Sequence, residues 1–259
     1  MDYGTAIRVL LQAHKLEVPA LKFNYRGEPT IHPRFKDILL FAKDLANGYT
    51  FQERIINTNM QFDSDREDIF EGLLAANKIK ISIDTFNIEL YNKLRKGPAC
   101  NYKRLINNIN KLYNHPKREP GHKIILQFVR GEENKEENFK KKANFLWPGI
   151  DISIRELVGG RSSKYKKPKG ERKSCIQAFA RLMVLHDGKL QVCCPNYKEH
   201  PALIVGHIDD LWGIKGAFNS PKAKIARKNL KNKKAFLTEP CKSCSSYESF
   251  KGWKQNKHA

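Results

Sequence analysis

The sequence predicts an α/β protein with a parallel sheet, followed by a small α+β metal-binding domain. Strand and helix patterns alternate from residue 4 to residue 157, which is typical of parallel βαβ units. Five of the six cysteines gather in the C-terminal third, at Cys175, Cys193, Cys194, Cys241 and Cys244. A basic segment with Pro, Gly and Ser at 161–174 separates the two parts, and this composition is typical of a linker.

The composition sets limits on the class of protein. The 259 residues, 40% of them hydrophobic and 10% aromatic, have room for one large domain or for a medium and a small one, which excludes wholesale disorder. No apolar run approaches the ~20 residues that cross a bilayer, and Arg8 interrupts the only N-terminal apolar stretch. A cytoplasmic protein is therefore expected. In that reducing compartment a Cys-x-x-Cys motif indicates a metal or redox site rather than a disulfide.

The formal net charge is +21, from 48 Lys and Arg against 27 Asp and Glu. A basic surface attracts nucleic acid, acidic peptides and other anions. The cations are spread along the chain, and the densest cluster, at 161–173, has the composition of a linker. A solvated linker is therefore favoured over a nucleic-acid interface, which stays possible, and no membrane association is expected.

Residues 1–160 contain the alternating elements. Helices are expected at 4–15, 34–46, 66–78 and 134–146, and helical material is expected after the third strand and through 104–113. Strands are expected at 20–25, 54–59, 79–84, 123–129 and 150–157. Ser64 and Glu67 are expected to form a capping box at the third helix. Five strands at this spacing predict a parallel sheet with right-handed crossovers. The first helix is not preceded by the strand that it should follow, which leaves one edge of the sheet unpaired.

Polar residues or glycine follow the first three strands. They are Gly27, Glu28, Asn57, Asn59, Ser82 and Asp84. The carboxyl ends of parallel strands hold the ligand site in α/β sheets. Gly27 would let a ligand approach the backbone, and the Glu28 carboxylate could meet an ammonium group. Each residue alone fits an ordinary turn or cap, but at three successive strand ends a ligand site is favoured.

The cysteines follow the pattern Cys175-x12-Gly188-x4-Cys193, with Cys241-x-x-Cys244 further along. The stretch "RLMVLHDGKLQVCC" predicts a β-hairpin, which would bring Cys175 and Cys193 close together. Four thiolates bind either Zn²⁺ or a [4Fe–4S] cluster. Buried free cysteines are the least favoured interpretation.

The rest of this part predicts a short strand in "ALIVGHI" and a helix that begins at Pro221 after the cap Ser220. A domain below about 70 residues commonly needs a disulfide or a bound metal to be stable. The metal is therefore expected to stabilise the fold as well as to serve in redox chemistry.

These motifs resemble those of radical SAM enzymes with a SPASM/twitch extension. The extension is matched by four motifs: "CCPN", "VGHIDDLW", "NSPKAKIAR" and "CKSC". In the first half, "YRGEPTIHP" resembles the GGEP motif of the barrel. The later strands and loop of the barrel are matched in position by "NTN", "ISID" and "YNKLR". The resemblance covers nearly the whole chain. It implies a partial (β/α) barrel missing its first strand at 1–160, a basic linker at 161–174 and a SPASM/twitch iron–sulfur domain at 175–259.

The resemblance also implies roles for individual residues. Gly27 and Glu28 would contact the amino end of S-adenosylmethionine (SAM), with Asn59 and Ser82 beside the same pocket. One auxiliary [4Fe–4S] cluster would be held by Cys175, Cys193, Cys241 and Cys244.

Cys194 is the rival of Cys193 as a ligand, and the Gly-x4-Cys spacing favours Cys193. No cysteine follows Cys244, which implies one auxiliary cluster rather than two. Cys100 has no expected role.

The sequence departs from the family in one motif, because CxxxCxxC, which holds the SAM-cleaving cluster, occurs nowhere in it. An N-terminally truncated chain is favoured over a degenerate member, and this chain is not expected to cleave SAM alone. A complete form would generate a 5′-deoxyadenosyl radical to modify a peptide, sugar or small-molecule substrate. An electron donor such as flavodoxin or ferredoxin would serve it. Whether this chain is itself an enzyme stays open.

Two alternatives remain. One is a non-enzymatic, zinc-binding nucleic-acid module, which would use the charge of +21; against it, Cys175 and Cys193 lie further apart than the ligands of a zinc knuckle. The other is a degenerate scaffold that uses a cluster only for folding.

Overall fold

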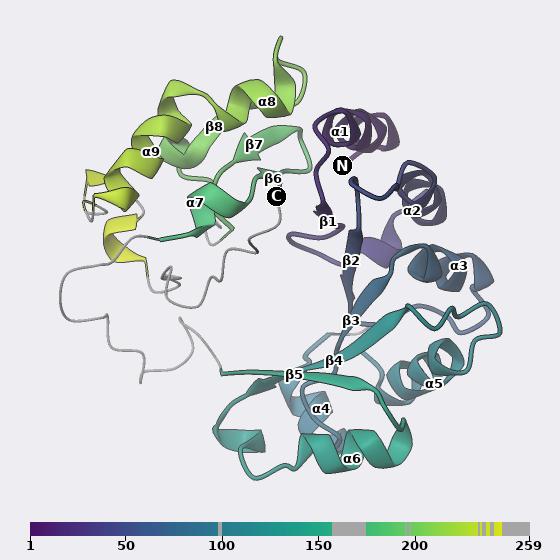
Figure 1. Cartoon of the computed structure of the whole chain (residues 1–259). Helices are drawn as coiled ribbons and strands as arrows, with labels where there is room; N and C mark the ends of the chain where they lie inside the picture. Colours follow the sequence, from purple (N-terminus) through teal and green to yellow (C-terminus); the bar gives the residue numbers. More distant parts are fainter. Residues whose placement is uncertain are drawn as a thin grey trace. The chain divides into compact units, whose positions relative to one another are not determined.

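The computed structural model of the chain describes residues 1–97, 100–156, 175–194, 196, 198–232, 234, 237–238 and 241–244 (Figure 1). These residues fall into two compact units. The first comprises residues 17–157, and the second joins residues 1–16 to the part that starts after residue 157. The predicted linker at 161–174 lies outside the described residues.

The first unit contains a five-stranded parallel sheet, as predicted. Its strands lie side by side in chain order. They are β1 (Ala20–Lys22), β2 (Glu53–Thr58), β3 (Lys78–Ser82), β4 (Lys123–Arg130) and β5 (Asp151–Glu156). Strand β1 is shorter than expected, and it and β5 form the two edges of the described sheet.

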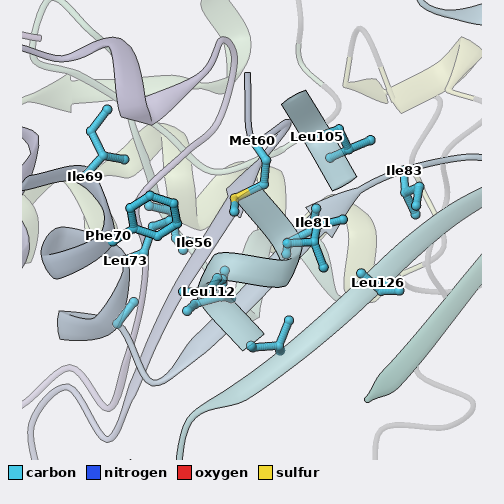
Figure 2. Close-up of a cluster of buried hydrophobic side chains, with 14 of the residues drawn as sticks. Ile56, Met60, Ile69, Phe70, Leu73, Ile81, Ile83, Leu105, Leu112 and Leu126 are labelled. Carbon is cyan, nitrogen blue, oxygen red and sulfur yellow. The ribbon is translucent and has the colours of Figure 1, made fainter. Parts of the chain in front are cut away.

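Helices connect the strands. They are α2 (Phe35–Asp44), α3 (Glu67–Ala75), α4 (Ile88–Leu94), α5 (Tyr102–Tyr113) and α6 (Phe139–Leu146), with the short 3-10 helices η1 (Pro29–Ile31) and η2 (Glu132–Asn134). Figure 1 shows α2, α3 and α5 along one side of the sheet. Between them lies a core that joins Ile56, Ile81 and Leu126 of the strands to Phe70 and Leu112 of the helices (Figure 2).

The other face of the sheet carries polar side chains beside the apolar Ile55 and Ile125. Side chains alternate between the two faces of a strand, so the neighbours of the buried residues Ile56, Ile81 and Leu126 point the other way. These neighbours include Asn57, Lys80, Ser82 and Gln127, and all four are partly exposed. One face of the sheet therefore holds the core, and the opposite face offers hydrogen-bonding groups.

The predicted capping box at α3 is wrong. The helix begins at Glu67, and its N-cap residue, Arg66, makes no side-chain capping bond. The Ser64 hydroxyl instead donates to Asn108 Oδ1 at 2.7 Å, and Glu67 binds His115 and Lys111. The Ser64 and Glu67 side chains therefore bind residues of α5 and His115 just after it, and they do not cap the start of α3.

The second unit contains a three-stranded antiparallel sheet in the order β6 (Met183–Val184), β7 (Lys189–Gln191), β8 (Ile204–His207). This confirms the predicted hairpin and the short strand. Around it lie α7 (Gln177–Ala180), η3 (Pro201–Leu203), α8 (Gly213–Phe218), α9 (Pro221–Lys231) and η5 (Cys241–Ser243).

The N-terminal helix α1 (Tyr3–Lys15) belongs to the same unit. Gln12 Nε2 donates to the Ile208 carbonyl at 3.0 Å, and Gln12 Oε1 accepts from the backbone N–H of Ile214 at 2.9 Å. Arg8 forms an exposed ion pair with Asp209. The helix therefore packs at the β8–α8 connection, whereas the sequence pattern had grouped it with the parallel sheet.

The predicted cap of α9 is confirmed: Ser220 Oγ accepts from the Ala223 N–H at 3.2 Å, and Pro221 is the first helical residue. In the described part of the chain, no helix has the length and apolar character needed to cross a membrane.

Candidate functional site

Each of the first three strands ends in a turn with a left-handed residue. Gly27, Met60 and Asp84 have φ angles of 80°, 55° and 63°. For Met60 and Asp84 this conformation costs about 1–3 kcal/mol, and such strained residues gather at functional sites. A Cβ added at Gly27 would meet nothing within 4 Å. The glycine therefore serves the backbone conformation and leaves open space beside it.

The structure brings Glu28 and Asn59 into direct contact. Glu28 Oε2 accepts from the Asn59 backbone N–H at 2.7 Å, while Oε1 accepts from the Thr30 N–H at 3.2 Å and the Thr30 hydroxyl at 2.9 Å. These bonds fix the carboxylate at the ends of β1 and β2. A carboxylate has about four acceptor positions, so Glu28 keeps capacity for a further donor such as an ammonium group.

Ser82 and Asn57 lie at the same edge of the sheet. Thr58 pairs with Ile81, which places Asn59 and Ser82 each one residue beyond that pair. Asn57 Oδ1 is buried and has no hydrogen-bond partner among the described residues. An unpaired buried acceptor costs about 1–3 kcal/mol, so a donor from water or a ligand is expected there. The sequence marked Asn57 as a strand-end residue but assigned it no role.

The end of β3 is fixed by a network that sequence reasoning missed. Asp84 Oδ1 accepts from the Val129 N–H at 3.2 Å, and its Oδ2 pairs with Arg95 at 2.5 Å. The Thr85 hydroxyl donates to Glu137 Oε2 at 2.7 Å. Both Asp84 oxygens are thus engaged inside the protein. These partners lie up to about fifty residues away in the sequence, and no local pattern indicates such pairs.

The cysteines come together in the second unit. Cys175 is buried in the same core that Cys193 and Cys241 pack against. Burial, with the charges of Cys241, Cys244, Cys175 and Cys194 nearby, raises the pKa of the Cys193 thiol to about 12. The packing thus brings Cys175, Cys193 and Cys241 to one core.

Within the described residues, no group of three or more His, Cys, Asp or Glu side chains meets the spacing of a bound metal ion. The donor set nevertheless fits a thiolate-ligated centre, because soft thiolates select iron–sulfur clusters and zinc. A metal cation would also supply the positive charge that favours the thiolate form. The choice of Cys193 over Cys194 stays a prediction.

Buried amides hold the segment after Cys193. Gln191 Nε2 donates to the Cys193 carbonyl at 2.9 Å, and Asn196 Nδ2 donates to Gln191 Oε1 at 3.2 Å. The His200 N–H donates in turn to Asn196 Oδ1 at 2.9 Å. The Asn of "CCPN" is therefore a structural residue that fixes the backbone beside the thiol.

Helix α9 holds the other two cysteine segments. Arg227 Nε donates to the carbonyl of Ala178, three residues after Cys175, at 2.9 Å. Asn229 Nδ2 donates to the Thr238 hydroxyl at 2.9 Å, and the Thr238 carbonyl accepts from the N–H of Lys242, between Cys241 and Cys244, at 3.2 Å. The sequence predicted α9 as a helix but gave no sign of this scaffolding role.

Comparisons with known proteins agree with this geometry. Residues 175–245 match the SPASM family, an iron–sulfur cluster-binding domain. The fold is similar to the structure of BtrN in complex with AdoMet and 2-DOIA, with a TM-score of 0.58, 15% identity, and 96% of this chain and 82% of that chain covered. It is also similar to selenomethionine BtrN in an open conformation, with a TM-score of 0.51, 15% identity, and 94% and 79% covered.

No protein of curated function matches the sequence. At 15% identity the likeness to BtrN shows the fold, and the SPASM match shows the kind of C-terminal domain. Both agree with the resemblance that the sequence motifs indicated: the chain has a fold similar to that of BtrN, and its residues 175–245 match the SPASM iron–sulfur domain.

Proposed function

We propose that Cys175, Cys193, Cys241 and Cys244 hold one auxiliary [4Fe–4S] cluster. The observation that carries this proposal is the packing of Cys175, Cys193 and Cys241 at one core inside a region that matches an iron–sulfur domain. When bound, such a cluster supplies one-electron transfer. The chain's own contribution is to hold the ligand segments, through α9 and through the amides of Gln191 and Asn196.

We also propose that the carboxyl edge of the parallel sheet binds SAM. The BtrN complex contains AdoMet, which supports this proposal. In the proposed arrangement, the backbone of this chain approaches SAM at Gly27, and the fixed Glu28 carboxylate accepts a hydrogen bond from the ammonium group of SAM. Asn59 and Ser82 line the same edge, and Asn57 Oδ1 offers a buried acceptor. The function would then be radical modification of a peptide, sugar or small molecule.

Anaerobic reconstitution with iron and sulfide, followed by iron and zinc quantitation, tests the cluster. The expected result is about four irons per chain and a visible absorption that dithionite bleaches. A colourless protein with about one zinc per chain would contradict the proposal and favour the nucleic-acid module.

Single Cys→Ser variants test the ligand assignment. Cys175→Ser, Cys193→Ser and Cys241→Ser are expected to lose most of the bound iron, while Cys100→Ser and Cys194→Ser keep it. Iron retained by Cys193→Ser and lost by Cys194→Ser would reverse the choice between the two neighbours.

SAM binding is tested by calorimetry rather than by cleavage, because the sequence contains no CxxxCxxC motif. Glu28→Gln removes the charge and leaves one acceptor oxygen, so it also loses one of the two backbone bonds that Thr30 and Asn59 donate to the carboxylate. It is expected to weaken SAM binding about tenfold or more, since bonds to charged groups contribute about 1.5–3 kcal/mol. The exposed Glu136→Gln is the matched control. Equal affinity in Glu28→Gln and the control would refute the assigned role.

A further inference from the structure

The segment around α9 is strongly basic. No Asp or Glu occurs between Asp210 and Glu239, although 27 of the 259 residues are acidic. The same segment contains eight cations: Lys215, Lys222, Lys224, Arg227, Lys228, Lys231, Lys233 and Lys234. The segment is less dense in cations than residues 161–173, but it is a 28-residue stretch in which no carboxylate side chain offsets them.

The cations on α9 lie opposite its buried side. Ala223, Ala226 and Leu230 face the core, whereas Lys224 and Lys228, four residues apart, are exposed. Residues at this spacing are neighbours on a helix surface. Lys222 and Ile225 are also exposed, with Ile225 at 59%. Together Lys222, Lys224, Ile225 and Lys228 define what we call the basic face of α9.

The basic face does not stabilise the helix. Like charges at i and i+4 destabilise a helix by about 0.2–0.5 kcal/mol per pair, and cations near a helix N-terminus oppose its dipole. Across the residues that the structure describes, Lys222, Lys224 and Lys228 form no ion pair with a carboxylate. Lys228, in the last turn, has the charge that the dipole favours, and this gain is similar in size to its repulsion with Lys224. Folding therefore gains little from the three charges together, and they are available to an anionic partner.

The other side of the same helix faces the cysteines. Ala223, Ala226 and Leu230 belong to the core that contains Cys175 and contacts Cys193 and Cys241. Arg227 and Asn229 bond the segments next to Cys175 and Cys241. A helix with its side chains is about 10–12 Å across, so the basic face lies about one helix diameter from the proposed cluster. Such a short path suits electron transfer.

We propose that the basic face of α9 is the docking surface for a small acidic protein that carries single electrons to the proposed cluster. This inference rests on the proposed cluster. In the transfer, the reduced carrier loses one electron and the oxidised cluster gains it, with no bond made or broken. Charge complementarity speeds the encounter, and electron-transfer complexes use small interfaces, which a helix face with one central Ile225 can supply.

Stopped-flow reduction tests the proposal. The oxidised, reconstituted chain is mixed with the hydroquinone form of a flavodoxin, a small acidic carrier, and the loss of cluster absorbance is followed. The triple variant K222E/K224E/K228E is expected to lower the reduction rate about tenfold or more at low salt. Its rate should also depend much less on salt concentration than that of the wild type.

Two controls isolate the docking step. The variant K103E/K140E/K141E changes the net charge equally at exposed residues of the other unit and should keep the wild-type rate within about threefold. Dithionite, which needs no docking, should reduce all three proteins equally. Glutamate at 222 and 224, near the N-terminus of α9, favours the helix dipole, and glutamate at 228, in the last turn, opposes it. Each effect is about 0.3–1 kcal/mol, so the α9 variant is expected to fold.

Each failure has a distinct meaning. If the reconstituted wild-type chain contains no iron, the proposed cluster is refuted before any kinetics are measured. Equal carrier rates in the α9 variant and the wild type, or equal losses in both triple variants, would overturn the docking surface. Single-stranded RNA that binds the wild type but not the α9 variant, with unchanged carrier rates, would instead assign the basic face to nucleic acid.

Discussion

At the scale of single residues, Gly188 shows why the cysteine pattern contains a glycine. Its φ is 86°, and an added Cβ would lie 2.6 Å from His207 Nε2, the atom that contacts the Asp187 carbonyl at 2.7 Å. Gly188→Ala is therefore expected to lower the free energy of unfolding by about 1–3 kcal/mol. Chemical denaturation followed by circular dichroism measures this change.

Gly48→Ala is the control for this substitution. Gly48 has no left-handed φ, and nothing lies within 4 Å of its added Cβ. Its effect should stay within about 0.5 kcal/mol. Similar losses in the two variants would mean that the turn does not require glycine.

A second residue makes stability depend on pH. Burial lowers the pKa of His122 below its ordinary value of 6.5, and Glu119 only partly offsets this effect. The unfolded chain thus binds a proton near pH 6.5 that the folded chain resists. The stability contribution of the neutral ring is complete above that pH, and it is lost as the pH falls below it.

We therefore expect the free energy of unfolding to fall as the pH is lowered below about 6.5, and to fall less steeply in His122→Asn. Denaturation curves at several pH values provide the test. An unchanged slope in His122→Asn would show that other groups set the pH dependence.

At the scale of elements, the Gln12 side chain adds hydrogen bonds to the apolar packing and the Arg8–Asp209 ion pair of α1. Gln12 makes both hydrogen bonds to the β8–α8 connection. Gln12→Ala keeps the helix propensity high but leaves the Ile208 carbonyl and the Ile214 N–H without these partners, a loss of about 1–3 kcal/mol. Hydrogen exchange at the Ile214 amide is the direct measurement, and it should accelerate.

Lys15→Ala is the matched control on the same helix, because Lys15 is exposed. It should leave exchange at Ile214 unchanged. Protection of Ile214 that survives Gln12→Ala would mean that α1 is not held by this side chain.

At the scale of the whole molecule, the two compact units have different sources of stability. The unit at 17–157 has an extended apolar core, whereas the C-terminal strands have two to four residues each. Small domains often depend on a metal for folding. Removal of the proposed cluster is therefore expected to reduce hydrogen-exchange protection in β6, β7 and β8 and to leave β2, β3 and β4 unchanged.

Cys241→Ser offers the same comparison without a chelator. Its peptides from β6–β8 should exchange like those of the metal-free wild type. Equal loss of protection in both units, or in neither, would contradict a local stapling role for the metal.

Much of the fold could be predicted from local sequence. The alternation of apolar and polar residues in β3 and β4 indicated strands with one buried face, and the Ser220–Pro221 pair indicated the start of α9. These features depend on side chains within a few residues of one another. In the same way, the spacing of Cys175, Gly188 and Cys193 along the chain was enough to indicate a metal centre.

Other features depended on distant partners. Ser64 lies three residues before Glu67, which is the spacing of a capping box. Its hydroxyl instead donates to the buried Asn108, whose amide also donates to the Met60 and Phe62 carbonyls. The unpaired Asn57 Oδ1 and the basic face behind the cysteines likewise follow from which segments pack together.

The sequence by itself determined the strands, the helices and the thiols, because propensity and spacing act over short range. Tertiary structure alone decided that α1 binds the C-terminal unit, that Glu28 meets Asn59 and that α9 ties together two cysteine segments. A buried polar group must find a partner wherever the packed chain offers one, and that choice is made only when the elements meet.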